Sequence, residues 1–331
     1  MKKALVIGID DYAVNPLQGC INDAKAIAAI VEKNGDGSPN FSIRLHTSDK
    51  EEVTSALLND KIAELFKGDA DVALLYFAGH GIINPATNAG HLVSQNGSRG
   101  AWGISLADIL NIANTAAPRI KSSVIILDSC HSGYAGEVPG LGSQAVAAIG
   151  EGVTILTACH REQTAAESDG HGLFTSIVLD ALSGGAADIC GRITPASVYS
   201  HVDQTLGPWE QRPIYKANVQ TFVTLREVAP KVPKEVLRRL PTYFPDAAYT
   251  FALDPSYERD RSNFTEEMKA KYPVNETNQQ IFAELQQCYR HGLVVPVDTV
   301  HMYYAAVESK ACKLSALGAH YRKLAVMQRI S

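Results

Sequence analysis

The sequence lacks long apolar runs, and none approaches the ~18 consecutive apolar residues of a membrane-spanning helix. The first apolar stretch, Ala4–Ile9, covers only six residues before Asp10-Asp11, which is too short for a signal peptide. Charged residues make up 20% of the chain and the net charge is −5, which disfavours a protein built to hold nucleic acid. We therefore expect a globular cytoplasmic protein without a membrane partner.

The chain also lacks paired cysteines. None of its six cysteines lies in a CxxC motif or at the close spacing of a zinc site or a compact disulfide framework. They are Cys20, Cys130, Cys159, Cys190, Cys288 and Cys312. In a reducing compartment we expect free thiols, so a reactive cysteine has to be recognised by its neighbours.

The composition indicates two domains. Hydrophobic residues make up 46% of the 331 residues, which is enough for more than one core. Residues 231–331 carry 14 Lys and Arg against 11 Asp and Glu, a net of +3, so the preceding part carries −8. Four prolines lie between 230 and 245. We expect a first domain over 1–228, a proline-rich boundary over 229–245 and a smaller, mainly helical domain over 246–331.

The first domain alternates strand-like and helix-like segments. Short apolar runs predict strands at 3–9, 43–46, 71–77, 122–127, 153–157 and 220–225. Helical periodicity predicts helices at 22–33, 51–66, 106–113 and 173–182, with a further helix opening at Thr194-Pro195. This order predicts an α/β fold with a mostly parallel sheet in three layers. Beyond the boundary we expect helices at 277–291, 298–308 and 313–328, with a break at 292–296.

Reactive side chains follow three of the predicted strands. Cys20 and Asp23 come after the first strand, His80 lies between two glycines after the third, and Asp128 and Cys130 follow the fourth. In a parallel sheet these strand exits meet at one edge, where sites are usually found. A thiol attacks a carbonyl well as a thiolate, so it needs a nearby imidazole and donors for the oxyanion. Cys130 and His80 supply the first two, and the Gly81 and Cys130 amides are candidates for the oxyanion hole.

Two motifs carry a resemblance to a known family. Tyr76-Phe-Ala-Gly-His-Gly81 resembles the histidine motif of caspases, metacaspases and their bacterial relatives, and Asp128-Ser-Cys-His-Ser-Gly133 is similar to the metacaspase-type cysteine motif. His80 and Cys130 lie 50 residues apart, the caspase-type spacing. Weaker similarities begin at Gly8, Gly19, Thr157 and Gly172, so the resemblance covers about residues 1–225.

The resemblance implies an endopeptidase with a Cys130–His80 dyad and no strong third member. It also implies that Asp23 and Asp128 line the primary specificity pocket. Two carboxylates there would favour Arg or Lys before the cut and repel Asp. The predicted partners are therefore protein substrates cut after basic residues.

The sequence departs from the family pattern at several points. Ala78 stands where relatives often have Ser, which removes a hydroxyl from the pocket. No Asp or Glu occurs between Val72 and Ala107, so we expect no calcium requirement and no other cofactor. Between His131 and His160 there is no Lys or Arg, so an Arg- or Lys-directed enzyme could not cut itself there. We expect the protein to work as one chain.

Simpler readings remain open for several residues. His131 adjoins Cys130, but chain neighbours usually point apart, which disfavours it as the base. Cys159-His160 is expected to end a core strand, and Cys20 is expected to be a pocket wall. Asp23 could cap the helix that begins beside it, and Asp128 could serve loop hydrogen bonds.

Two further hypotheses concern the whole molecule. A catalytically silent scaffold would keep only the fold, which the intact Cys130, His80 and flanking glycines disfavour. The C-terminal part could be a winged-helix-like nucleic-acid binder, but its net +3 is small and no basic stripe is present. Bacterial relatives are often fused to sensor modules, and some resemble antiphage or cell-death effectors. By that analogy we expect an activating nucleotide signal or partner protein to act on the C-terminal domain.

Overall fold

The computed structural model describes residues 1–330 except 85–86, 88, 130–136, 139–145, 148, 159–166, 169, 208–212 and 221–222. The chain divides into two compact units. The first comprises Met1–Ala187 with Arg192–Ala229, and the second comprises Asp188–Gly191 with Pro230–Ser331. Within the described residues, no helix combines the length and the apolar composition that crossing a bilayer requires.

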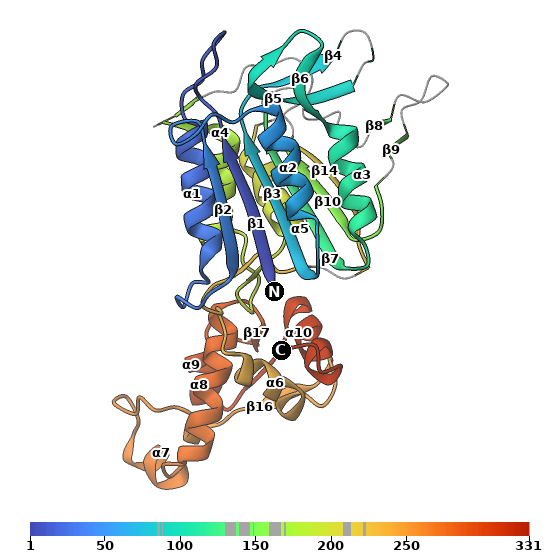
Figure 1. Cartoon of the computed structure of the whole chain (residues 1–331). Helices are drawn as coiled ribbons and strands as arrows, with labels where there is room; N and C mark the ends of the chain where they lie inside the picture. The colour runs from blue at the N-terminus through green and yellow to red at the C-terminus, as the bar shows by residue number, and fades with distance from the viewer. Residues whose placement is uncertain are drawn as a thin grey trace. The chain divides into compact units, whose positions relative to one another are not determined.

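A central sheet organises the first unit (Figure 1). In the described part of the chain it has six strands in the order β14-β10-β7-β3-β1-β2, and only β14 runs antiparallel to its neighbour. Their bounds are β1 (Lys2–Gly8), β2 (Phe41–Thr47), β3 (Ala70–Ala78), β7 (Ile120–Asp128), β10 (Val153–Thr157) and β14 (Ile214–Asn218). This is the expected α/β fold with a mostly parallel sheet.

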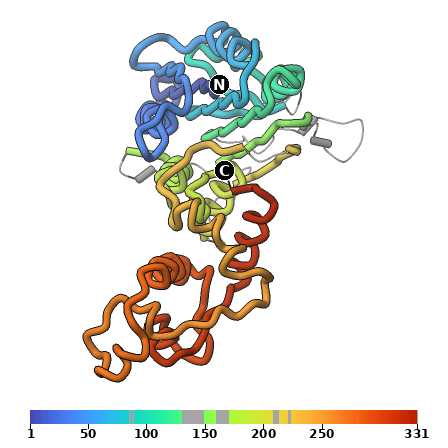
Figure 2. The backbone as a smooth tube through the Cα atoms, turned by 90° about the horizontal axis from the view of Figure 1, so that it is seen from below, coloured from blue at the N-terminus to red at the C-terminus, as the bar shows by residue number. Residues whose placement is uncertain are grey.

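Helices cover both faces of the sheet, as Figure 2 shows. One face packs against α1 (Cys20–Glu32), α4 (Leu173–Asp180) and α5 (Pro195–Thr205), and the other against α2 (Ser55–Leu65) and α3 (Leu106–Ala116). A π-helical turn, Ala181–Gly185, extends α4. Strand side chains alternate between faces, so Tyr76 belongs to the first core and Phe77 to the second. Both faces are covered, which explains why these strands are apolar at nearly every position.

Several helix starts follow from their own sequence. The Ser105 hydroxyl accepts a hydrogen bond from the Asp108 amide and caps α3. Thr194 caps α5 through the Ser197 amide, with Pro195 at the first helical position, as expected. Both caps leave the helix starts fixed against the sheet.

Small sheets accompany the central one. The three-stranded antiparallel sheet β4 (Gly81–Asn84), β5 (Ala89–Ser98) and β6 (Ala101–Ser105) directly follows His80. Three two-stranded pairs complete the described part of the unit. These are β8 (Glu137–Val138) with β9 (Val146–Ala147), β11 (Glu167–Ser168) with β12 (His171–Gly172), and β13 (Arg192–Ile193) with β15 (Arg226–Glu227).

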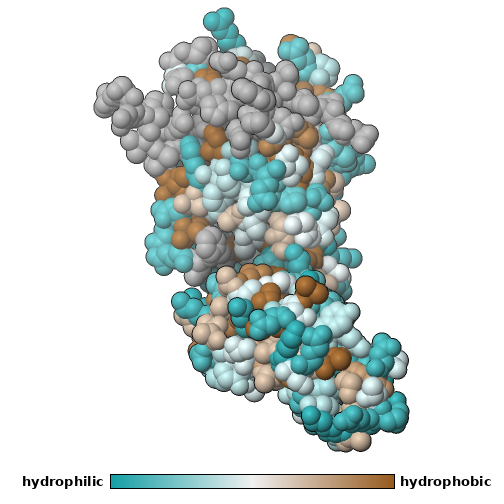
Figure 3. Space-filling view, turned by 180° about the vertical axis from the view of Figure 1, so that it is seen from behind, coloured by the Kyte–Doolittle hydropathy of each residue, from teal (hydrophilic) through white to brown (hydrophobic). Residues whose placement is uncertain are grey.

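The second unit has its own core of helices and a three-stranded sheet. The sheet order is β16-β18-β17. Its elements are α6 (Lys234–Tyr243), β16 (Thr250–Ala252), a 3₁₀ turn (Pro255–Tyr257), α7 (Glu266–Lys271), α8 (Glu276–Arg290), β17 (Val294–Val297), α9 (Met302–Val307), β18 (Ala311–Leu314) and α10 (Ala316–Val326). Hydrophilic side chains cover the surface around α7 on the face that Figure 3 shows, and α7 buries none of its residues.

Some sequence expectations were wrong in detail. The last strand of the central sheet is Ile214–Asn218 rather than 220–225. Leu225 is apolar because it is buried in the core, not because it belongs to a strand of this sheet. The boundary segment 229–245 contains α6, whose Val236 and Leu237 are buried in the second unit. The C-terminal part is less helical than expected, because β17 occupies the predicted break at 292–296 and β18 delays the last helix to Ala316.

Candidate active site

His80 stands just beyond the end of β3, where a glycine lets the chain turn. The Tyr12 hydroxyl accepts a hydrogen bond from the His80 amide at 3.0 Å and donates one to the Val93 carbonyl at 3.1 Å. A Cβ at Gly79 would lie 2.6 Å from that hydroxyl oxygen, so a side chain there would displace Tyr12. The Tyr12 and His80 rings also contact each other, with centroids 4.5 Å apart. Tyr12 thus fixes the backbone and ring of His80.

A backbone carbonyl orients the imidazole. His80 Nε2 lies 2.6 Å from the Asn15 carbonyl oxygen. That oxygen can only accept, so Nε2 carries hydrogen and Nδ1 is the basic nitrogen of the neutral ring. Asn15 has a left-handed backbone (φ 54°), which Asn adopts more readily than most residues. No sequence motif indicates this contact, because any residue supplies a carbonyl.

The pairing of β3 with β7 aligns the two strand exits. Ala78 is paired with Asp128, and the Gly79 amide donates to the Asp128 carbonyl at 3.2 Å. His80 follows Ala78 by two residues, and Cys130 follows Asp128 by two residues. Cys130 itself lies outside the described residues, as do His131, Cys159 and His160.

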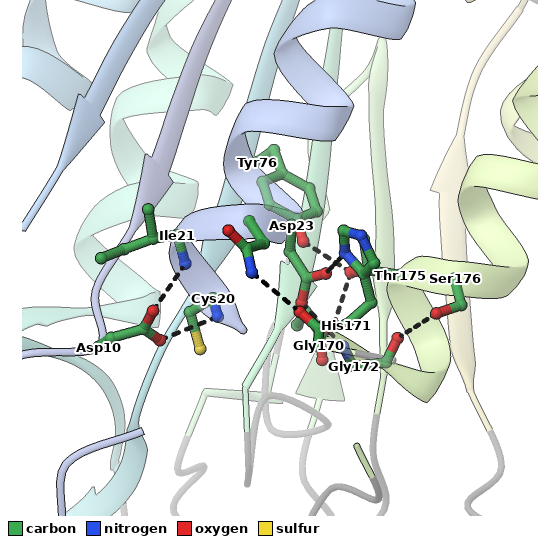
Figure 4. A network of polar contacts seen from close by, with 12 residues as sticks. Asp10, Cys20, Ile21, Asp23, Tyr76, Gly170, His171, Gly172, Thr175 and Ser176 are labelled. Atoms are coloured by element: carbon green, nitrogen blue, oxygen red, sulfur yellow. Dashed lines mark hydrogen bonds and ion pairs between the residues drawn. The ribbon is translucent and has the colours of Figure 1, made fainter. Parts of the chain in front are cut away.

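Two carboxylates, those of Asp23 and Asp128, lie close to Gly172. Figure 4 shows Asp23 beside His171 and Gly172. A Cβ at Gly172 would lie 3.0 Å from Asp128 Oδ2 and 3.2 Å from Asp23 Oδ2, so a side chain there would press tightly against both carboxylates. Asp23 accepts hydrogen bonds from His171 Nδ1 at 2.6 Å and from the Gly172 amide at 3.1 Å. Asp128 Oδ2 accepts one from the Thr175 hydroxyl at 2.6 Å.

Neutral donors support Asp128. Tyr76 Oη lies 2.6 Å from Thr175 Oγ1. Thr175 donates to Asp128, so Tyr76 is the donor to Thr175. Burial, followed by the charge of Asp128, raises the pKa of Tyr76 well above its usual value, which keeps this hydroxyl a donor.

Burial makes both carboxylates harder to ionise. It raises the pKa of Asp128 to about 6, with the nearby Asp23 adding to the rise and the Thr175 hydrogen bond opposing it. Burial also raises the pKa of Asp23, against the hydrogen bonds from His171 and Gly172. Among the described residues, neither carboxylate forms an ion pair with Lys or Arg. Asp23 is 2% exposed, and Asp128 as a whole residue is half-buried with its carboxylate close to Gly172 and Thr175.

Asp10, rather than Asp23, satisfies the start of α1. Its two oxygens accept hydrogen bonds from the Cys20 amide at 2.9 Å and the Ile21 amide at 3.2 Å (Figure 4). Burial raises the pKa of the Cys20 thiol, and the Asp10 charge raises it further. Cys20 therefore stays a thiol, which makes it unsuitable as a nucleophile. In the described part of the chain, no group of three or more His, Cys, Asp or Glu side chains is arranged to hold a metal ion.

Comparison with known proteins decides the family. The sequence profile of the caspase domain matches residues 1–224, about two thirds of the chain. The chain belongs to the caspase family. Members of this family are generally cysteine peptidases, and residues beyond 224 form an extra C-terminal region. The resemblance read from the two motifs is thus confirmed.

Two further comparisons add less. The crystal structure of protein GSU0716 from Geobacter sulfurreducens has 15% sequence identity to this caspase-family chain and a TM-score of 0.49. The similarity covers 69% of this chain and 97% of that one. No curated protein matches the sequence.

Several residues of this caspase-family site carried no assigned role in the sequence reasoning. His171 and Thr175 lie in or next to the Gly172-Leu-Phe-Thr-Ser176 similarity, and Asp10 and Tyr12 lie in the similarity that begins at Gly8. These segments could therefore be flagged from the sequence. Their roles could not, because they depend on which strand exits face each other.

Proposed function

We propose that this caspase-family protein is a cysteine endopeptidase with Cys130 as nucleophile and His80 as base. The observation that carries the proposal is the Ala78–Asp128 pairing, because His80 and Cys130 each follow that pair by two residues. In this mechanism His80 Nδ1 accepts the thiol proton while Nε2–H stays with the Asn15 carbonyl. The Gly81 and Cys130 amides stabilise the tetrahedral oxyanion.

The preferred residue before the cut is Arg or Lys. Asp23 and Asp128 both lie close to Gly172, and neither has a Lys or Arg partner among the described residues. Buried carboxylates gain most from a cation that pairs with them, and a substrate guanidinium can bond to both oxygens of one carboxylate. A substrate Asp would meet like charge instead, which disfavours it.

Replacing either dyad member tests the proposal. Cys130→Ala and His80→Ala should each lower kcat/KM on Arg-containing peptides by at least about a thousandfold, because the two groups act as one unit. Cys20→Ser is the matched control and should keep most of the activity. Circular dichroism checks that each variant folds. Wild-type turnover by Cys130→Ala would refute the nucleophile, and a wild type inert to peptides and to thiol-directed electrophiles would indicate a silent scaffold.

We propose that the second unit regulates the protease. It is a compact unit with its own core, so a ligand or partner could bind it and favour a competent state already accessible to the first unit. Full-length protein should therefore cleave Arg peptides slowly until an activator is added. A chain truncated after residue 228 should no longer respond to that activator. Maximal activity of the full chain alone, unchanged by truncation, would exclude this role.

A further inference from the structure

A pocket of about 490 Å³ opens beside His80, in the described part of the chain. Its walls come from the loop at 12–15 and from the small sheet β4-β5-β6. Mainly apolar groups line it, among them Val14, Ile82, Val93 and the half-buried indole of Trp102. Arg99 is exposed and also borders it. This pocket is formed by different elements from those that carry Asp23 and Asp128.

The pocket is tied to His80 by hydrogen bonds. Tyr12 bonds both to the His80 amide and to the Val93 carbonyl, so one side chain connects the base to the pocket wall. Gln95 donates to the Asp11 carbonyl at 3.0 Å and accepts from the Val53 amide at 2.5 Å. A Cβ at Gly97 would lie 2.5 Å from the Trp102 carbonyl oxygen, so β5 and β6 pack closely there. The pocket is preformed rather than created by substrate.

The chemistry of the proposed reaction decides which part of a substrate comes near His80. The thiolate attacks the carbonyl carbon, and the C–N bond breaks as the protonated imidazole gives its proton to the leaving nitrogen. The acyl part stays on the cysteine as a thioester, which water then hydrolyses. The leaving nitrogen must come within about 2.6–3.2 Å of the imidazole to receive the proton. The residue after the cut therefore lies on the His80 side.

We propose that this pocket binds the side chain of the residue immediately after the cut, and that it selects large apolar residues such as Phe or Leu. The inference rests on the proposed peptidase function and extends it to the leaving group. Trp102 is its main specificity-determining residue, because an indole face offers a large apolar surface and stacks on aromatic rings. The substrate is then read at both sides of the scissile bond, by charge before it and by apolar contact after it.

Peptides that differ only after the cut test the inference. Three peptides carry Arg before the cut, followed by Phe, Gly or Asp, and a fourth substrate is an N-acyl arginine methyl ester, whose leaving group has no side chain. The full-length wild type should prefer Phe over Gly by at least tenfold in kcat/KM. Trp102→Ala should bring that ratio to about one. The kcat/KM of this variant should fall at least tenfold more for the Phe peptide than for the ester. Arg99→Ala should keep the Phe to Gly ratio.

A binding measurement makes the test independent of turnover. In full-length Cys130→Ala, the Phe peptide should bind about tenfold more tightly than the Gly peptide, and Trp102→Ala in that background should remove the difference. Cleavage of all Arg peptides at equal rates would overturn the pocket assignment and leave the proposed function standing. A preference for Asp after the cut, lost in Arg99→Ala, would also overturn it. If no peptide is cleaved and thiol-directed electrophiles also leave the wild type unlabelled, the proposed function fails, and equal dissociation constants would reject the pocket as well.

Discussion

Each unit holds a carboxylate in its interior, but the two carboxylates have different partners and opposite pKa shifts. In the second unit, Glu284 accepts hydrogen bonds from Arg239 at 2.7 and 2.9 Å and from the Tyr243 hydroxyl at 2.6 Å. Burial alone would raise the pKa of Glu284, but the bonds from Arg239 and Tyr243 outweigh it and lower the pKa. In the first unit, Asp128 has a threonine hydroxyl and a second carboxylate for neighbours, and its pKa rises to about 6.

Under the proposed function, this difference separates a structural carboxylate, Glu284, from one that binds a substrate cation, Asp128. Glu284 has its cation within the same unit, and the bonds from Arg239 and Tyr243 offset the cost of burying its charge. Asp128 and Asp23 are held close together although like charges repel, and among the described residues only neutral donors or His171 support them. A folded protein tolerates such an arrangement best where function requires it. The part of the chain that the structure describes gives these carboxylates no Lys or Arg partner, and we propose that the substrate brings that cation.

Removing the charge of Asp128 should have its largest effect on kcat/KM. Asp128→Asn keeps the shape and the acceptor for Thr175 but removes the charge, so kcat/KM for Arg peptides should fall at least thirtyfold, or about 2 kcal/mol. Asp23→Asn should cost less, because Asp23 is buried behind Gly172 and both of its oxygens are already bonded. Peptide kinetics with Arg, Lys and Asp before the cut measure this. Efficient cleavage after Asp would contradict the acidic pocket.

Stability should respond in opposite directions in the two units. Arg239→Met leaves Glu284 buried without its cation and should destabilise the second unit by about 1–3 kcal/mol, a range reduced because Arg239 is 46% exposed. Asp128→Asn should instead stabilise the first unit at pH 7.5, on the order of 1 kcal/mol, because it removes an ionised group from a site that disfavours charge. Urea unfolding followed by circular dichroism measures both. Loss of stability in Asp128→Asn would mean that its charge is compensated in the folded protein.

The smallest effect concerns pH. The pKa of Asp128 is raised above its unfolded value, so between about pH 4 and 6 the folded protein binds more protons than the unfolded chain. Its contribution to stability is therefore greatest below pH 4 and is lost as the pH rises through 6. Binding of a basic side chain follows the opposite trend, because the carboxylate must be ionised. The ratio of kcat/KM for Arg and Gln peptides should fall severalfold from pH 7.5 to 5.5, and the ratio cancels titration of the dyad. In Asp128→Asn this ratio should not change with pH. A ratio that does not change with pH in the wild type either would exclude Asp128 as the pocket charge.

The sequence predicted the central strands well because they are buried on both faces. Such strands are short apolar runs, as at β3 and β7, and their exits carry the reactive motifs. The edge strand β14 was missed because its exposed side carries polar residues such as Lys216 and Asn218, while Leu225 nearby is apolar for core packing. The small sheet β4-β5-β6 was also missed, since its glycines and polar residues weaken the strand signal.

The other contacts of the site could not be predicted from the sequence, because they join segments that are far apart along the chain. His171 and Asp23 are 148 residues apart, and the Asn15 carbonyl meets His80 across 65 residues. Asp23 at a helix start suggested a cap equally well, and only the structure shows Asp10 in that role. In the second unit, Pro296 lies within β17, where a proline in the sequence suggested a break.

The pairing of Ala78 with Asp128 has a consequence for how this chain can change in length. One residue inserted between Ala78 and His80 would change the offset of the imidazole from this pair and disturb the hydrogen bonds from the His80 amide to Tyr12 and from Nε2 to the Asn15 carbonyl. By contrast, the turn at Gly37 has open space around it and could accept extra residues with little penalty. A single-codon insertion after Gly79 is therefore a way to silence the proposed peptidase while leaving every side chain of the original protein in the sequence.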